Sequence, residues 1–336
     1  MKNKSKIIIN LIIIFVVLSL VLYFSLKDNY QEIIDNIKNM NIIWLIISII
    51  ILIISRIFSA VSSYQMTKAN DHHVSFLRAI QINLIIPFFH GVTPFAGGGQ
   101  PMEIYYLHNE KIPLGKSTNI VLQNFIVYQT ALIIISLIAV IYNAIFDLFP
   151  ANSLIKQLVI IGFIINFLVW LFTLLVSLSK KFNQVILKIT LFILKKFNRP
   201  ALKEKITRYL SNLHKNATTI IKHKKSSLLS LFANILSLIC LYSIPYLVLT
   251  GMGITNLNII ETIVATSYIM IMGSFVPIPG GTGGLEYGYM YFFNYLIGGS
   301  ILTSSMLVWR FVSYYLAMII GAIVLALYRK KENKCV

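Results

Sequence analysis

The segment "TPFAGGGQPMEIYY", Thr93–Tyr106, interrupts the first third of a very apolar chain. It holds two prolines, three consecutive glycines, a glutamine and a glutamate, which a membrane-spanning helix seldom carries together. Irregular backbone at membrane depth is tolerated only where it is buried in protein or lines a water-filled cavity. The segment therefore predicts a break between two short helices inside a membrane protein.

The composition points to an integral membrane protein. Hydrophobic residues make up 57% of the 336, charged residues make up 12%, and the mean hydropathy is +0.79. Cys240 and Cys335 are the only cysteines, so neither a disulfide framework nor a thiolate metal site is expected. No His, Cys or carboxylate spacing matches a metal site. We therefore predict no metal and no cofactor, and we assign no catalytic residue.

Six runs are long enough to cross about 30 Å of hydrocarbon. They cover roughly residues 7–26, 42–66, 117–146, 153–179, 226–250 and 301–328. Two pairs of shorter stretches, 76–92 with 101–109 and 257–276 with 285–297, are each read as a re-entrant helical hairpin. The predicted fold is an all-α polytopic membrane protein, a single membrane domain over residues 1–336.

The basic residues set the orientation. With the N-terminus inside, 24 of the 29 lysines and arginines fall on the cytoplasmic side, three fall outside, and Arg56 and Arg310 lie within spans. Because positive charge favours the cytoplasmic side, both termini are expected there. The first hairpin would then open to the cytoplasm and the second to the outside.

The opening segment has a counterpart near the other end of the chain. "PFAGGGQPMEIYY" from Pro94 and "PIPGGTGGLEYGY" from Pro277 are identical at five of thirteen positions. The flanking spans run in opposite directions, so the units at about 42–146 and 226–328 would form an inverted repeat. Inverted repeats whose broken helices meet near the bilayer midplane are typical of transporters. The alternative is that the glycines are tight-packing hinges without a ligand.

Two arginines and two glutamates are expected at membrane depth, where ionisable groups face an interior or pair with each other. These four charges either neutralise one another as a structural network or contact a lipid headgroup. The predicted substrate-binding residues are Arg56, Gly97, Gly98, Gln100, Glu103, Gly280, Gly281, Gly283, Glu286 and Arg310. The predicted cavity-lining residues are Gln123, Asn124, Tyr128, Tyr106 and Tyr289, although interhelical hydrogen bonds and interfacial tyrosines would also explain them.

Residues 180–225 carry thirteen basic residues and one acid, Glu204. Lys181, Lys188 and Lys195 recur every seven residues, and an apolar stripe is expected on the opposite side, formed by Val185, Ile186, Ile189, Phe192 and Ile193. This pattern predicts amphipathic helices on the anionic cytoplasmic leaflet. The alternative is a loop that only sets topology, and the apolar stripe argues against nucleic-acid binding.

The two glycine segments, together with Arg310 in "WRFVSYYLAMIIGAI", resemble signature segments of the lysylphosphatidylglycerol synthase transmembrane region, or flippase-like, family. The resemblance covers essentially the whole chain. It implies a membrane region that moves an aminoacylated phosphatidylglycerol between leaflets. In fuller-length relatives a separate cytoplasmic domain transfers lysine from its transfer RNA to the lipid. The chain is expected to carry the membrane region alone.

The predicted function is a transporter that moves an anionic or aminoacylated glycerophospholipid between leaflets of a bacterial cell membrane. Its partners would be that lipid and the anionic membrane surface, and a homo-oligomer is compatible with the sequence. One alternative is a lipid-headgroup enzyme of the phosphatidylglycerol lysyltransferase type. Another is a channel or an auxiliary membrane subunit.

Overall fold

The computed structural model describes residues 30–93, 97–149, 154–196, 222–273 and 278–332. Within these ranges every regular element is a helix. The expected first span, 7–26, lies outside the described residues, as do Pro94, Pro277 and most of the basic segment after Lys196.

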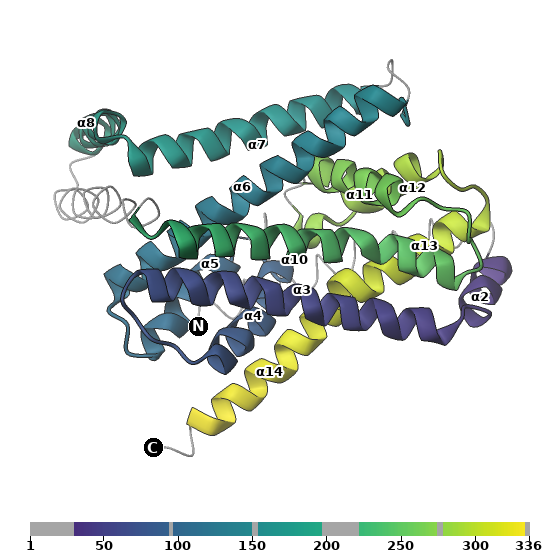
Figure 1. Ribbon diagram of the computed structural model, residues 1–336, viewed down its shortest axis with the longest axis horizontal. Helices are drawn as coiled ribbons and strands as arrows, with labels where there is room; N and C mark the ends of the chain where they lie inside the picture. The colour runs from purple at the N-terminus through teal and green to yellow at the C-terminus, as the bar shows by residue number, and fades with distance from the viewer. Residues whose placement is uncertain (1–29, 94–96, 150–153, 197–221, 274–277, 333–336) are drawn as a thin grey trace.

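Long apolar helices dominate the described chain (Figure 1). Five of them are long and apolar enough to cross a membrane: Ile42–Ala69, Leu114–Phe146, Val159–Ser177, Lys224–Gly251 and Ser300–Tyr328. They match the expected second to sixth spans. The molecule is thus an all-helical membrane protein.

These spans correspond to α3 (Ile42–Ala69), α6 (Leu114–Phe146), α7 (Leu154–Leu178), α10 (Lys224–Gly251) and a composite last span. The last span consists of α13 (Ser300–Arg310), a π-helical stretch η3 (Phe311–Leu316) and α14 (Ala317–Glu332). A π-helical stretch widens the helix locally and is frequent at functional sites. It falls here directly after Arg310.

Helices α3 and α10 pack closely side by side (Figure 1). The Ser55 hydroxyl lies 3.0 Å from that of Ser237, and the Ser230 hydroxyl donates to the Ser62 carbonyl at 2.9 Å. From the first contact to the second, the residue number rises by seven on α3, from Ser55 to Ser62, and falls by seven on α10, from Ser237 to Ser230. The two helices are antiparallel.

Two pairs of short helices fill the spaces between these spans. One pair is α4 (Phe76–Gly91) with α5 (Gly99–Asn109), and the other is α11 (Ile259–Gly273) with α12 (Gly284–Phe293). At 16 residues, α4 is about 24 Å long, so it is too short to cross the hydrocarbon core alone. Figure 1 shows the α4–α5 pair towards one end of the bundle and the α11–α12 pair towards the other.

Helix α2 (Tyr30–Lys38) packs against α13 at one end of the bundle, where the Asn36 amide donates to the Ser300 hydroxyl at 3.0 Å. Helix α8 (Lys180–Lys196) follows α7 directly and is seen almost end-on in Figure 1, whereas the long helices lie in the plane. It therefore runs across the bundle axis.

The arrangement of side chains on α8 differs from the expectation. Lys181 and Phe192 are eleven residues apart, which is about three full turns, so they project to the same side of the helix. Val185, Ile189 and Phe192 are exposed next to exposed Lys181 and Lys188. The lysines therefore border the exposed apolar stripe, and the expected opposite placement was wrong.

Candidate functional site

The second glycine segment ends in a buried ion pair. Arg310 Nε donates to Glu286 Oε1 at 2.7 Å, and both side chains are less than one-tenth exposed. The guanidinium also donates to the Gly280 carbonyl at 3.1 Å, while the Gly283 N–H donates to Glu286 Oε2 at 2.7 Å. Glu286 thus caps the first turn of α12 and holds Arg310 against the loop.

The loop reaches this position through left-handed backbone at three glycines, Gly280, Gly281 and Gly283. At Gly280, where φ is +68°, an added Cβ would overlap the Tyr314 ring. Tyr314 lies on η3, its ring centroid is 4.5 Å from the Arg310 guanidinium carbon, and its hydroxyl donates to the Gly91 carbonyl at 2.9 Å. Since Gly91 ends α4, Tyr314 connects the end of α4 to the glycine loop that precedes α12.

The glutamate of the first segment has different neighbours. Glu103 on α5 is 8% exposed, and its Oε1 accepts from the Ser63 hydroxyl of α3 at 3.0 Å. The Asn124 amide of α6 is a second hydrogen-bonding partner. Asn124 Oδ1 in turn accepts from the Ser62 hydroxyl at 2.7 Å. These neighbours are neutral, so this cluster joins α3, α5 and α6 without an ion pair.

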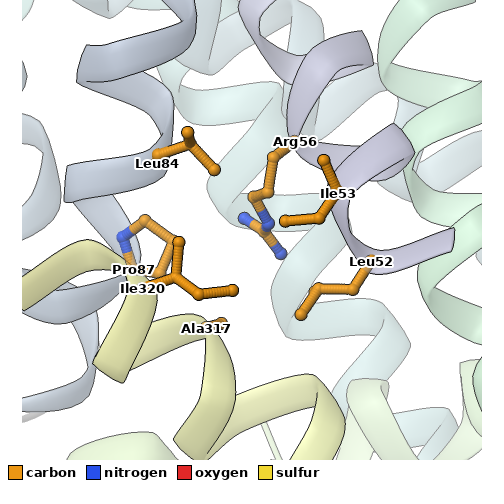
Figure 2. A pocket seen from close by; sticks show the side chains of 7 residues that line it. All are labelled: Leu52, Ile53, Arg56, Leu84, Pro87, Ala317 and Ile320. Atoms are coloured by element: carbon orange, nitrogen blue, oxygen red, sulfur yellow. The ribbon is translucent and has the colours of Figure 1, made fainter. Parts of the chain in front are cut away.

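Arg56 occupies a narrow pocket between α3, α4 and α14. Figure 2 shows its guanidinium directed between the α4 and α14 side chains that line the pocket with it. The other lining residues are all apolar: Leu52, Ile53, Leu84, Pro87, Ala317 and Ile320. Arg56 Nε is buried and has no hydrogen-bond partner within the described chain. Tyr128 on α6 is close enough to interact electrostatically with the guanidinium.

The four expected charges therefore do not form one mutual network. Arg310 pairs with Glu286, whereas neither Arg56 nor Glu103 forms an ion pair with a described residue. The Arg56 pocket lies about 10 Å along the last span from the Arg310 cluster, because its lining residue Ala317 follows Arg310 by seven residues. One cation is thus neutralised by a carboxylate, whereas the other has no carboxylate partner among the described residues.

The remaining candidates have structural contacts. Gly97 is exposed, Gly98 donates its N–H to the Thr93 hydroxyl at 2.8 Å, and Gln100 is half-buried in the first turn of α5. Gln123 accepts from the Asn70 amide at 2.7 Å, which ties α6 to the end of α3.

Tyr106 and Tyr289 lie in packed core regions. Tyr106 is 2% exposed and meets Tyr328 edge to face. Tyr289 is fully buried, stacks on Phe293 and Trp309, and donates to Ser305 at 3.0 Å. Neither lines the Arg56 pocket.

Sequence reasoning missed the polar seam between α3 and α10 and the role of Tyr314. The seam comprises Ser55, Ser59 and Ser62 on α3 and Ser230, Asn234 and Ser237 on α10. Its signal was available, because both sets recur at spacings of four and three, which places small polar residues on one helix face. No comparable signal marked Tyr314.

The described side chains offer a cation, the Arg56 guanidinium, that could bind an anionic group within the helix bundle. No group of three or more His, Cys, Asp or Glu side chains gathers anywhere in the described ranges. A guanidinium without a partner can donate to a phosphate, and its planar fork favours bidentate contacts.

Comparison with known proteins agrees with this architecture. A curated relative, the UPF0104 membrane protein of Archaeoglobus fulgidus, is 22% identical over 297 residues, which cover 85% of this chain and 87% of the relative. The family model described as "Lysylphosphatidylglycerol synthase TM region" matches residues 7–321, nearly the entire chain. The protein therefore belongs to the family of the lysylphosphatidylglycerol synthase transmembrane region.

Proposed function

We propose that the protein moves a phospholipid with an anionic or aminoacylated headgroup between the two leaflets of the membrane. The observation that carries this proposal is the half-buried Arg56 side chain, whose Nε is buried and unpartnered in an otherwise apolar pocket. An arginine at the centre of a spanning helix costs roughly 2.5–3.5 kcal/mol on insertion scales. A phosphate that binds there offsets this cost only while a headgroup is in transit.

The depth of Arg56 supports this role. It is the fifteenth of the 28 residues of α3, halfway along the span. A headgroup that crosses the bilayer must leave water near this level, where a charged partner compensates most of the lost hydration. Arg310 would remain bound to Glu286 and hold the α12 loop in place beside the route.

The two short-helix pairs supply the moving parts in this proposal. Each would enter the membrane from one side and return to it, with α4–α5 opening to the cytoplasm and α11–α12 to the outside. The antiparallel packing of α3 on α10 is what two inverted units require. Broken helices at such a junction let access alternate around a fixed site.

The proposed location is the bacterial cell membrane, with both termini in the cytoplasm. The distribution of lysine and arginine supports this orientation, because cytoplasmic segments carry most of the positive charge. α8 would then lie on the inner leaflet.

The proposal is tested by reconstitution into liposomes that contain phosphatidylglycerol labelled on an acyl chain, so that the headgroup is intact. Albumin added outside extracts labelled lipid only from the outer leaflet, so wild-type protein is expected to accelerate the extraction of label that starts in the inner leaflet. Arg56→Gln should slow this movement about tenfold, which corresponds to a lost interaction of about 1.4 kcal/mol in the transition state.

Arg78→Gln is the matched control, because Arg78 forms a partly exposed ion pair with Glu110 at 3.2 Å, away from the pocket. It should translocate lipid like the wild type. Folded wild-type protein that leaves the transbilayer rate unchanged would contradict the function. An Arg56→Gln variant as active as the wild type would contradict the site.

A further inference from the structure

The two glutamates that occupy matching positions in the glycine segments have unlike surroundings. Glu286 accepts hydrogen bonds from a guanidinium and a backbone N–H. Glu103 accepts from a serine hydroxyl and an asparagine amide, both neutral. Both carboxyls are buried, with exposed fractions of 5% for Glu286 and 8% for Glu103. The difference is the presence of a counter-charge.

The neighbourhood of Glu103 holds few groups that could provide one. Helix α5 packs on α4 and α6, and Ser63 brings α3 against it. Besides Glu103, the titratable or charged side chains on these four helices are Arg56, Tyr64, Lys68, Arg78, His90, Tyr105, Tyr106, His108, Lys116, Tyr128 and Tyr142. None of the cations among them comes within 4.0 Å of the Glu103 carboxyl.

Most of the cations among these groups either pair with another residue or lie far from the Glu103 carboxyl. Arg78 pairs with Glu110, and Lys68 and Lys116 are exposed at helix ends. Arg56 lies seven residues before Ser63, which is about 10 Å along α3. His90 is the nearest titratable group on α4, since its ring lies against Gly99, one turn before Glu103.

A buried carboxylate without a counter-charge is costly, whereas a protonated carboxyl needs only hydrogen bonds. Protonation also changes its role, because the carboxylate only accepts hydrogen bonds and the acid both donates and accepts. The Ser63 hydroxyl can satisfy either form, because by rotating it donates to the carboxylate or accepts from the acid. The Glu103 cluster can therefore exchange one proton with limited rearrangement.

We propose that Glu103 is a proton-binding site that couples lipid movement to a proton gradient. The proposal rests on the proposed function. A proton taken from water on one side neutralises Glu103, and α5 can then shift against α3 and α6 without a buried charge. The proton leaves to water on the other side as the carboxylate regains access there. Carboxylates in membrane interiors are typical sites of proton relay.

The test uses liposomes with a trace of acyl-labelled phosphatidylglycerol and a pH gradient of one unit. One proton coupled to one lipid supplies about 1.4 kcal/mol per pH unit, which limits the leaflet ratio to about tenfold. Wild-type protein is expected to shift the ratio several-fold from its value without a gradient, and a protonophore should remove the shift. Glu103→Gln should leave the ratio unresponsive to pH.

Glu110→Gln is the matched control, because Glu110 caps the same helix at a partly exposed position. It should respond to the gradient like the wild type. A second measurement does not need transport: infrared difference spectra of the wild type should show a protonated carboxyl band that titrates. That band should be absent in Glu103→Gln and present in Glu110→Gln.

The possible outcomes separate the two proposals. Wild-type protein that moves no lipid contradicts the proposed function, whereas movement that ignores the gradient contradicts only the proton site. A gradient response that persists in Glu103→Gln overturns the inference. The inference is also overturned if Glu103→Gln changes only the relative transport rates of lipids with and without a headgroup amine. Glu103 would then bind substrate. If Glu103→Gln does not move lipid, the infrared spectra test the proton site: a titrating carboxyl band that persists in this variant overturns the inference, and its loss supports it.

Discussion

The Tyr314 hydroxyl donates a 2.9 Å hydrogen bond to the carbonyl of Gly91, a residue 223 positions earlier in the chain. The bond joins the π-helical stretch of the last span to the end of α4. The same ring covers Gly280 and the Arg310 guanidinium. One side chain therefore contacts the end of α4, the second glycine segment and the buried ion pair.

Removing this hydroxyl should loosen the contact between the hairpins. Tyr314→Phe leaves the Gly91 carbonyl without its donor and should destabilise the folded protein by about 1 kcal/mol. Thermal unfolding of the purified protein in one detergent measures the change. Tyr315→Phe is the control, because the buried Tyr315 hydroxyl has no partner among the described residues, so its removal should cost little. Equal losses in the two variants would show that the Gly91 bond contributes nothing.

The Arg310–Glu286 pair should be far more sensitive to single than to double substitution. Arg310→Met leaves a buried carboxylate uncompensated and is expected to cost about 3–5 kcal/mol. Arg310→Met combined with Glu286→Leu removes both charges and should recover much of that loss. Stability against denaturant in detergent, measured for both single variants and the double, completes the cycle.

The Arg78–Glu110 pair supplies the comparison for that cycle. Its side chains are 29% and 22% exposed, so solvent screens the attraction. Arg78→Met should cost at most about 1 kcal/mol. If both pairs gave the same loss, burial would not be the source of the sensitivity at Arg310.

Gly280→Ala tests the close approach of Tyr314 to the loop. A left-handed conformation costs an L-residue about 1–2 kcal/mol, and the new methyl would also overlap the Tyr314 ring. Gly253→Ala separates the two effects, because Gly253 has φ of +90° with open space around it. Gly280→Ala should therefore destabilise the protein more than Gly253→Ala in thermal unfolding. In a Tyr314→Ala background, the difference in destabilisation between Gly280→Ala and Gly253→Ala should become smaller. An unchanged difference would exclude steric overlap with the ring as its cause.

Helix α8 is expected to lie in the lipid headgroup region with its exposed apolar stripe buried. The stripe of Val185, Ile189 and Phe192 is bordered by lysines, which can extend towards anionic headgroups while their stems stay in apolar surroundings. In reconstituted protein, Phe192→Trp fluorescence should be quenched by lipids brominated on the acyl chain. Quenching should increase as anionic lipid replaces neutral lipid.

Gln184→Trp is the matched probe on α8, because residue 184 is exposed but lies about 80° around the helix from residue 192. It should be quenched less. Equal and weak quenching at both positions would place α8 in water.

The local properties of the chain were accessible from its sequence. Mean hydropathy and run length predicted the five described spans, because a helix in lipid must be apolar along about twenty residues wherever its neighbours lie. Proline and glycine likewise predicted breaks before Gly99 and Gly284, since these residues act on their own stretch of backbone. The sequence also selected Arg56, Glu103, Glu286 and Arg310 as the charges to explain.

Which of those charges meet was decided by tertiary structure. Arg310 reaches Glu286, but Glu103 is held by Ser63 and Asn124, although both glutamates follow the same glycine pattern. Pairing depends on which faces of non-adjacent helices pack together, and hydropathy does not encode those faces. For the same reason the contact of Tyr314 with Gly91 had no sequence signal, because it requires the last span to lie against the first hairpin.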